Sequence, residues 1–144
     1  MGSQSQSYPT SKSRWTGRIL SGLAVLFLLW DGAIKLMVLA PVAEAFVRLG
    51  YPVSLAVAIG TLELVCLAIY VIPRTSLLGA VLLTGYLGGA IATHVRVEDP
   101  LLTHTVFPVY VAALVWGGLY LRDARLRAVV RHAFSAPVAA GVRQ

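Results

Sequence analysis

The chain has 144 residues, the length of one domain, and 58 % of them are hydrophobic while only 12 % are charged. Both fractions lie far from those of soluble globular proteins, and the mean hydropathy is +0.78. The composition therefore excludes an ordinary soluble domain and indicates a membrane protein. The net charge of +6 does not indicate a nucleic-acid partner, because the basic residues form no single patch.

Charged residues are absent from four long windows of the sequence, at 19–30, 52–62, 75–93 and 105–121. With its neighbouring residues, each window approaches the roughly 20 residues that a helix needs to cross about 30 Å of hydrocarbon. We therefore predict an all-α integral membrane protein in which residues 14–122 form a four-helix bundle. The four predicted membrane spans are residues 18–39, 53–72, 76–94 and 105–121.

The segment before the first span, residues 1–13, is rich in Ser and Gln and lacks the apolar content needed to fold alone, so we expect a disordered tail. Arg14, Arg18 and the apolar run after them resemble a signal peptide, with the small-residue pattern at 43–45 as its cleavage site. The run continues to Ala40, however, and is longer and more charged than the roughly 7 to 15 apolar residues of a signal peptide. We expect it to remain as the first span.

Residues 42–50, between the first two spans, carry apolar side chains at helical spacing and two charged side chains, one turn apart, on the opposite face. The apolar residues are Val42, Ala45, Phe46 and Leu49, and the charged ones are Glu44 and Arg48. This pattern predicts a short amphipathic helix on the outer surface, ended by Gly50. It is either a connector or a lid over the mouth of the bundle.

The second and third spans are joined by only a few residues, Ile72-Pro-Arg-Thr75, which predicts an antiparallel hairpin. The third span carries Gly85-x-x-x-Gly89, and small residues at this spacing let helix backbones approach closely in lipid. We predict that they pack inside the bundle, with contact between two copies of the chain as the alternative. Glu98-Asp99-Pro100 signals a turn before the fourth span.

The basic residues are divided unequally between the two sides of the predicted bundle. Of the twelve Lys and Arg residues, nine precede the first span or follow the second or fourth, two lie on the other side, and Lys35 lies within the first span. The positive-inside rule then makes both termini cytoplasmic. We expect a multi-pass membrane protein, with residues 123–144 as a basic cytoplasmic tail and anionic lipid headgroups as partners.

Three charged residues lie within the predicted spans: Asp31 and Lys35 in the first and Glu63 in the second. An ionised side chain at bilayer depth costs about 2.5 to 3.5 kcal/mol on insertion, so such residues usually pair, face the interior and mark a functional site. At 1.5 Å per residue, the three lie about 7 to 15 Å below the outer ends of their spans. His94 and His104 lie at the same outer ends, which predicts that the ionisable groups converge in the outer half of the bundle.

Asp31 and Lys35, spaced i and i+4, can form an ion pair on one helix face. Two carboxylates beside one ammonium predict either that Asp31 and Glu63 share Lys35 or that one carboxyl is protonated at neutral pH. A protonated carboxyl there would be a usable proton donor or acceptor. A purely structural role, which fixes how the helices pair, is the alternative. Tyr86, on one face of the third span, is a further residue that could reach the same pocket.

Cys66 is the only cysteine, so one chain can form neither a disulfide nor a thiolate cluster for iron–sulfur or zinc. His94 and His104 have no third histidine close by, so we predict no metal site. We therefore expect no intrinsic cofactor.

Several motifs, in order and with matching spacing, resemble the DoxX-like family of small bacterial membrane proteins over about residues 17–127. They are Arg18-Ile-Leu-Ser-Gly-Leu, Asp31-Gly-Ala-Ile-Lys35, Ile72-Pro-Arg-Thr75, Leu83-Thr-Gly-Tyr-Leu-Gly-Gly-Ala90 leading to His94 and Arg96, and Phe107-Pro108 leading to Trp116-Gly-Gly-Leu-Tyr-Leu-Arg122. The resemblance implies a four-helix integral protein of the bacterial inner membrane. It places the chain in the DoxX superfamily, a group named for a subunit of a thiosulfate:quinone oxidoreductase. Most DoxX-like members have no established activity, so the resemblance supports the fold more than any reaction.

The polar residues and the resemblance together predict an outward-half pocket that binds a small hydrophobic or quinone-like ligand, with the protein as an accessory subunit of a redox complex. The candidate catalytic residues are Asp31, Glu63 and Lys35: a carboxylate would move a proton while the ammonium stabilises developing negative charge. The candidate ligand-binding residues are His94, Tyr86 and His104.

Two other functions stay open. One is a membrane isomerase or hydrolase that uses an intramembrane carboxylate as acid or base. The other is a non-catalytic structural or assembly partner. The expected partners are the lipid bilayer and either a second copy of the chain or a membrane redox protein. A transport role would require an oligomer, because 144 residues hold no internal repeat.

Overall fold

The computed structural model describes residues 11–100 and 105–135, and within these ranges it contains six α-helices and no strand. The helices are α1 (Ser11–Leu36), α2 (Ala40–Arg48), α3 (Leu55–Val71), α4 (Ser76–Arg96), α5 (Phe107–Arg122) and α6 (Ala124–Ser135). The prediction of an all-α protein is confirmed for the described residues. Each of the four predicted spans is occupied by one long helix, α1, α3, α4 or α5.

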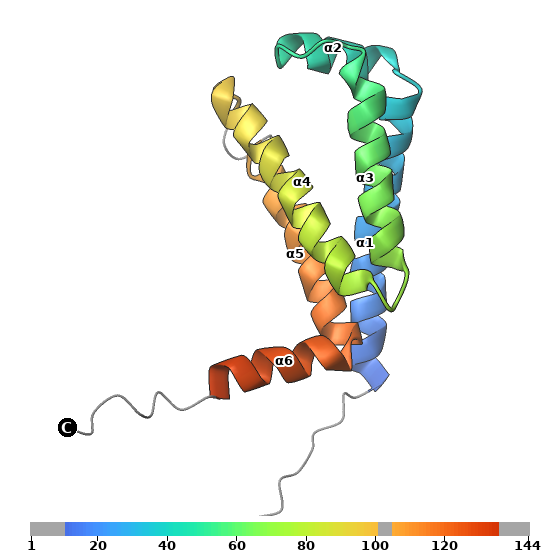
Figure 1. Cartoon of the computed structure of the whole chain (residues 1–144), viewed down its shortest axis with the longest axis vertical. Helices are drawn as coiled ribbons and strands as arrows, with labels where there is room; N and C mark the ends of the chain where they lie inside the picture. Colours follow the sequence, from blue (N-terminus) through green and yellow to red (C-terminus); the bar gives the residue numbers. More distant parts are fainter. Residues whose placement is uncertain (1–10, 101–104, 136–144) are drawn as a thin grey trace, which may run out of the picture.

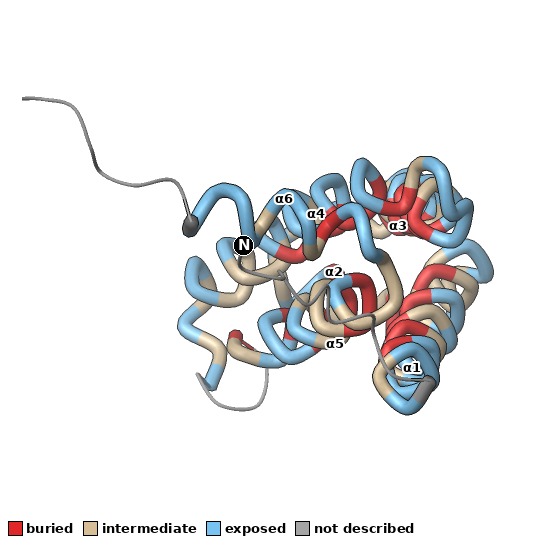
Figure 2. Tube along the Cα trace, turned by 90° about the horizontal axis from the view of Figure 1, so that it is seen from below, coloured by how far each residue is buried: buried red, intermediate tan, exposed pale blue. Residues whose placement is uncertain are grey.

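These four helices share one apolar core. α1 packs against α3 and α5, and α4 packs against the same two helices, whereas α2 and α6 lie at opposite ends (Figure 1). The core contains Leu28, Tyr70, Leu83 and Val115, one from each helix and each at most 1 % exposed. Figure 2 shows that buried and exposed positions alternate along these helices, so each has one face toward the core and one face outward.

Two helical segments are long and apolar enough to cross a membrane by length and composition, Lys12–Leu36 in α1 and Ser76–Arg96, which is α4. α3 and α5 are also apolar but have 17 and 16 residues, or about 25 Å at 1.5 Å per residue. The outward faces of all four helices carry large exposed apolar side chains. Examples are Leu26, Leu62, Leu78 and Val109. Soluble monomers rarely expose apolar surface on this scale.

The ends of α1 differ from the predicted first span. The helix begins at Ser11, within the segment predicted as a tail, while residues 1–10 lie outside the described part of the chain. It ends at Leu36, three residues before the predicted end. Val38 adopts a positive φ of 48° just beyond it, a left-handed conformation that an α-helix cannot continue through. Pro41 then lies in the first turn of α2, where its missing N–H costs little.

The predicted amphipathic helix is present as α2, and its buried residues Val42 and Phe46 belong to the expected apolar face. Gly50 follows it with a φ of 72°, a backbone conformation that glycine adopts without strain. At the other end, Asp123 separates α5 from α6, and its Oδ1 accepts a hydrogen bond of 2.8 Å from the Arg125 backbone N–H. The rest of the predicted basic tail, residues 136–144, lies outside the described residues.

The predicted packing of Gly85 and Gly89 inside the bundle is wrong. Both glycines are exposed, and a Cβ built on either would meet no atom within 4 Å. The reason is the rotation of α4 about its own axis. Leu83 and Leu87 lie on the face of α4 that packs against the core, so Gly85 and Gly89, each two positions further along, lie on the outward face. Close approach occurs elsewhere, for example at Gly118, where a Cβ would lie 2.6 Å from the Ser21 backbone N.

Candidate functional site

Four side chains from three helices meet around the Lys35 ammonium. Lys35 Nζ donates hydrogen bonds to Asp31 Oδ2 on the same helix, to Glu63 Oε2 on α3 at 2.9 Å, and to the Tyr86 hydroxyl on α4 at 3.1 Å. The Tyr86 hydroxyl in turn donates to Glu63 Oε2 at 2.8 Å. We call Asp31, Lys35, Glu63 and Tyr86 the Lys35 network. The structure thus brings together the three candidate catalytic residues and one candidate ligand-binding residue.

A glycine contact places Lys35 within reach of Glu63. Gly60 lies one turn before Glu63 on α3, and a Cβ there would lie 2.7 Å from Lys35 Cβ and 3.0 Å from the Gly32 carbonyl oxygen. Both distances are too short for a real side chain. The backbones of α1 and α3 therefore approach closely at this point because residue 60 has no side chain.

The donors of the network are fully used. An ammonium has three protons, and the three acceptors of Lys35 account for all of them. The single proton of the Tyr86 hydroxyl is used on Glu63 Oε2. Lys35 Nζ also lies 5.7 Å from the centroid of the Tyr86 ring, within cation–π range.

One acceptor of the network is unused. The Glu63 side chain is 0 % exposed, and its Oε1 is buried with no hydrogen-bond partner among the described residues. The Lys35 side chain is 14 % exposed and that of Asp31 is 31 % exposed, so the network opens outward on the Asp31 side. A buried carboxyl oxygen without a donor is unusual, because most buried polar atoms are hydrogen-bonded. It can accept a hydrogen bond from a ligand or carry a proton.

His94 belongs to a second polar cluster at the α2 end. His94 Nδ1 lies 2.6 Å from Asp99 Oδ2, and Arg48 Nη1 donates to Asp99 Oδ1 at 2.9 Å. His94 follows Tyr86 by eight residues on α4, about 12 Å along the helix, so it lies closer to the α2 end than the Lys35 network does. The predicted ligand residue His104 lies outside the described residues.

Sequence reasoning missed the partner of Arg48. Arg48 forms its ion pair with Asp99, in the connection after α4, a contact that the sequence analysis did not predict. The sequence predicts the turn at 98–100 and the helix at 42–50 on the same side of the membrane, and this shared position is the signal that could have indicated the contact.

The Lys35 network does not line a cavity found at the other end of α1. This cavity is open to the outside, has a volume of about 230 Å³, and its wall includes Arg18, Tyr70 and Arg122. The predicted pocket around Glu63 therefore stays a prediction. Within the described ranges, no three His, Cys, Asp or Glu side chains are grouped as a metal ion would require. Cys66 is buried among the apolar core residues.

Comparison with known proteins gives one match. A family model described as DoxX-like family matches residues 19–118, a segment that includes the whole Lys35 network. Neither the curated proteins nor the solved structures contain a match to this chain. The matched segment covers well over half of the sequence, and its two long apolar helices agree with a membrane protein. The chain therefore belongs to the DoxX-like family.

Proposed function

We propose that this protein is a multi-pass inner-membrane protein whose Lys35 network binds a small, membrane-soluble, hydroxyl-bearing ligand of the quinol type, as an accessory subunit of a redox complex. The observation that carries the proposal is the buried, unpartnered Oε1 of Glu63. The family and the apolar helices support the membrane setting, and the chemistry of the network supports the class of ligand.

The outer surface supports four membrane crossings. α3 and α5 fall short of the usual 20 residues, but a helix that is slightly too short is accommodated by local thinning of the bilayer. Both carry exposed apolar side chains on their outward faces, including Val65 and Val109. Lipid is the solvent in which such faces are stable.

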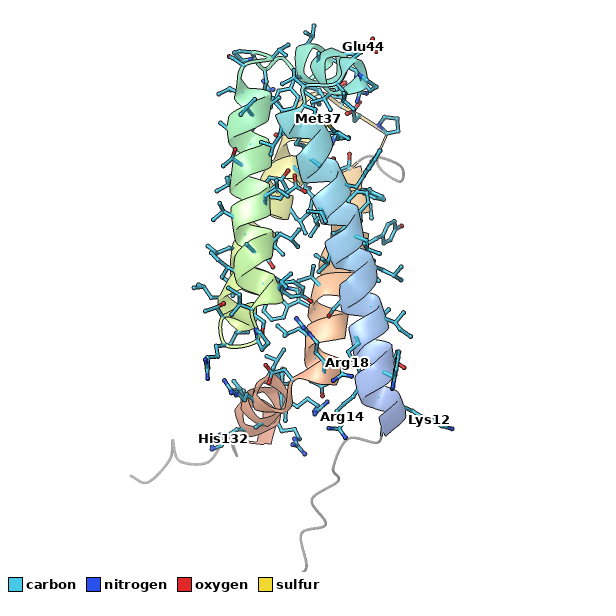
Figure 3. All side chains as sticks on the ribbon, turned by 90° about the vertical axis from the view of Figure 1, so that its right-hand side faces the viewer. Lys12, Arg14, Arg18, Met37, Glu44 and His132 are labelled. Carbon is cyan, nitrogen blue, oxygen red and sulfur yellow. The ribbon has the colours of Figure 1, made fainter. Side chains whose placement is uncertain are left out.

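The distribution of charge supports cytoplasmic termini. Lys12, Arg14, Arg18 and His132 lie at the α6 end, while Met37 and Glu44 lie at the α2 end (Figure 3). A concentration of Lys and Arg on one side is the signature of the cytoplasmic face. The basic helix α6, which crosses this end, is then placed to meet anionic lipid headgroups.

The state of the donors supports a hydroxyl-bearing ligand for the network. A quinone presents carbonyl oxygens and needs a donor, but Lys35 and Tyr86 have none to spare. A quinol presents hydroxyl groups, and Glu63 Oε1 is an acceptor without a partner. The network therefore favours the reduced, hydroxyl-bearing form, which would donate to Oε1.

The same geometry supports a role in proton movement. A ligand hydroxyl held on Glu63 Oε1 is placed to pass its proton to that carboxylate. Lys35 Nζ, which lies 2.9 Å from the other oxygen of Glu63, would stabilise the negative charge that remains near the site. The sequence has a single cysteine, and the described residues group no metal ligands. The two electrons released when the quinol is oxidised would therefore pass to a redox-active partner subunit.

Binding is tested by what copurifies with the protein. Lipid extracts of the detergent-purified wild type and of Glu63→Gln are analysed for quinol and quinone, with Glu44→Gln as the control that removes an exposed carboxylate. We expect the wild type and the control to retain quinol and Glu63→Gln to lose it while keeping its helical content. A wild type without ligand that also fails to bind an added short-chain quinol would contradict the proposal.

A structural role for the network is the second candidate. It is favoured by the complete pairing of Lys35, whose contacts join α1, α3 and α4. Under this role Glu63→Gln loses folding stability rather than ligand. Unfolding of the purified variants in detergent, measured beside quinol retention, separates the two functions because each predicts loss of only one property.

A further inference from the structure

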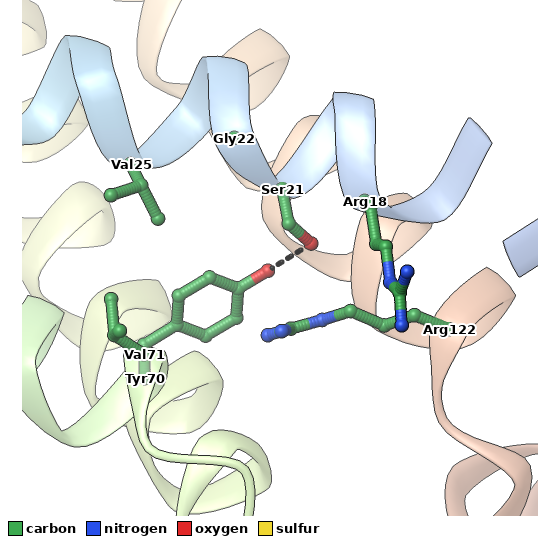
Figure 4. Close-up of a pocket in the computed structure, with 7 residues that line it drawn as sticks. All are labelled: Arg18, Ser21, Gly22, Val25, Tyr70, Val71 and Arg122. Carbon is green, nitrogen blue, oxygen red and sulfur yellow. Dashed lines mark hydrogen bonds between the residues drawn. The ribbon is translucent and has the colours of Figure 1, made fainter. Parts of the chain in front are cut away.

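The cavity at the α6 end lies between three helices. α1 contributes Arg18, Ser21 and Gly22 to its wall, α3 contributes Tyr70, and α5 contributes Arg122 (Figure 4). Its volume of about 230 Å³ is far above the roughly 10 to 15 Å³ that one water requires. The cavity lies at the opposite end of α1 from the network assigned to the proposed function.

The Arg122 side chain is incompletely partnered. Its Nε and Nη2 are buried and have no hydrogen-bond partner among the described residues. The guanidinium carbon lies 5.0 Å from the centroid of the Tyr70 ring. The ring attracts the positive charge, but the two nitrogens still lack acceptors, which is costly for a buried cation.

A second arginine faces the same space. Arg18 is exposed and lines the cavity together with Arg122. Figure 4 shows the Arg122 guanidinium extending toward the Tyr70 ring and the Arg18 guanidinium beside the stem of the Arg122 side chain. Four ion pairs occur in the described ranges, and none of them includes either arginine. The nearest acid in sequence, Asp123, accepts a hydrogen bond from the first turn of α6. Two like charges beside one cavity, without a carboxylate, are stabilised by an anion.

The hydroxyl groups of the wall are already engaged. The Tyr70 hydroxyl donates to the Val115 carbonyl oxygen at 2.9 Å, so the Ser21 hydroxyl must be the donor in the 3.0 Å hydrogen bond between them. These two hydrogen bonds hold the wall in place, so the guanidinium groups are the donors that remain for an anion in the cavity. Gly22 lines the cavity, and a Cβ there would meet no atom within 4 Å, so the space beside this glycine is open.

We infer that this cavity is a binding site for a phosphate group, held by Arg122 and Arg18. The planar guanidinium matches two phosphate oxygens at once and forms short, charge-assisted hydrogen bonds with them. The site lies at the end of the helices where basic residues are concentrated (Figure 3), so the phosphate belongs either to an anionic lipid headgroup or to free phosphate in the adjoining solution.

The test uses two variants that change the cavity in different ways. Arg122→Gln removes the incompletely partnered cation, and Gly22→Leu fills the cavity while leaving both arginines in place. Arg125→Gln is the matched control, because it removes the same charge from an exposed position that does not line the cavity. Helical content measured by circular dichroism shows that each variant folds, and Gly22→Leu tests the site even if Arg122→Gln does not fold.

Two ligands distinguish the source of the phosphate. In the first arm, inorganic phosphate is titrated onto lipid-free protein in a non-ionic detergent, with chloride at equal ionic strength as the reference, and the thermal midpoint is followed. In the second arm, protein from nanodiscs of phosphatidylcholine with phosphatidylglycerol is analysed by native mass spectrometry for retained phosphatidylglycerol. We expect binding in at least one arm to weaken at least about tenfold in Arg122→Gln and in Gly22→Leu. A change of this size corresponds to the loss of one or more charged hydrogen bonds.

Each result has a definite meaning. Retention of phosphatidylglycerol alone assigns the site to a lipid headgroup, stabilisation by phosphate alone assigns it to the free anion, and both together support a site for the shared phosphate group. The inference is overturned if neither ligand binds, if chloride acts as strongly as phosphate, or if Arg125→Gln loses as much binding as the two cavity variants.

Discussion

Lys35 on α1 donates a hydrogen bond of 3.1 Å to the Tyr86 hydroxyl on α4, although the two residues are 51 positions apart in sequence. The same hydroxyl donates to Glu63 on α3. Tyr86 is thus the residue through which α4 joins the ion pairs of α1 and α3. It also uses the last proton of the ammonium, so the bonding of Lys35 is complete only when all three helices are in place.

Removing the cation should destabilise the protein strongly. In Lys35→Met, Asp31 and Glu63 remain as two carboxylates without their shared ammonium, and Glu63 is fully buried. Breaking a buried ion pair from one side costs about 3 to 5 kcal/mol. We expect a loss of this size in the free energy of unfolding in mixed detergent micelles.

The control for this change restores charge balance. Lys35→Met combined with Asp31→Asn and Glu63→Gln removes all three charges, and neutral replacements of buried ion pairs are often well tolerated. The triple variant should therefore be more stable than Lys35→Met alone. Equal stability of the two would show that uncompensated charge is not the cause of the loss.

Tyr86→Phe should have a smaller effect. The change removes one acceptor of Lys35 and the donor to Glu63 Oε2 but keeps the ring. Leaving a buried polar group unpaired costs about 1 to 3 kcal/mol. Tyr110→Phe, at a residue of α5 that is 54 % exposed, is the matched control and should change the free energy of unfolding little. Similar losses in both variants would contradict a specific role for the Tyr86 hydroxyl.

Two glycine substitutions should change stability in opposite directions. A Cβ at Gly60 would lie 2.7 Å from Lys35 Cβ, whereas a Cβ at Gly85 would meet nothing within 4 Å. We expect Gly60→Ala to cost about 1 to 3 kcal/mol through overpacking between α1 and α3. Gly85→Ala should gain up to about 1 kcal/mol from helix propensity.

Both variants are measured by the same unfolding assay. Their comparison separates the effect of packing from that of helix propensity, because each substitution adds one methyl group at a position in the middle of a helix. A loss at Gly85 larger than the loss at Gly60 would instead indicate that the outer face of α4 contacts a second copy of the chain.

The residues of the Lys35 network were identifiable from sequence because charge is rare in apolar helices. After Arg18 at its start, the predicted span 18–39 contains only Asp31 and Lys35 as charged residues, and the span 53–72 contains only Glu63. The rise per residue predicts all three in the outer half of their spans. Their pairing needs only that they share the bundle interior. The bounds of the helices were predictable to within a few residues, except at the start of α1, for the same reason.

Two features were not identifiable in this way: the rotation of each helix about its axis, and the pairing of side chains that are distant in sequence. The spacing of Gly85 and Gly89 indicates that they share a face of α4 but not which neighbour that face meets, and the apolar residues around them suit both lipid and core. Arg18 and Arg122 read as ordinary flanking charges, since the positive-inside rule accounts for them without a cavity. Only the packing of α1, α3 and α5 brings these arginines to one space.

The direction of the hydrogen bonds at Tyr70 leads to a final prediction about the free energy of unfolding. Its hydroxyl is fully buried, donates to the Val115 carbonyl oxygen and accepts from Ser21. Tyr70→Phe therefore removes a donor and an acceptor and should cost about 1 to 3 kcal/mol, whereas Ser21→Ala leaves the bond to Val115 intact and should cost less. The phenyl ring still faces Arg122 in Tyr70→Phe, so the cation–π contact is kept.

Unfolding of these two variants is compared with that of Tyr120→Phe, which alters an exposed tyrosine on α5. If Ser21→Ala proved the more costly change, the serine hydroxyl would have to bond a group other than Tyr70. A larger loss in Tyr70→Phe than in Ser21→Ala would indicate that the hydrogen bonds from Ser21 to Tyr70 and from Tyr70 to Val115 hold the wall of the cavity. If apolar packing alone held the wall, both losses would match the control.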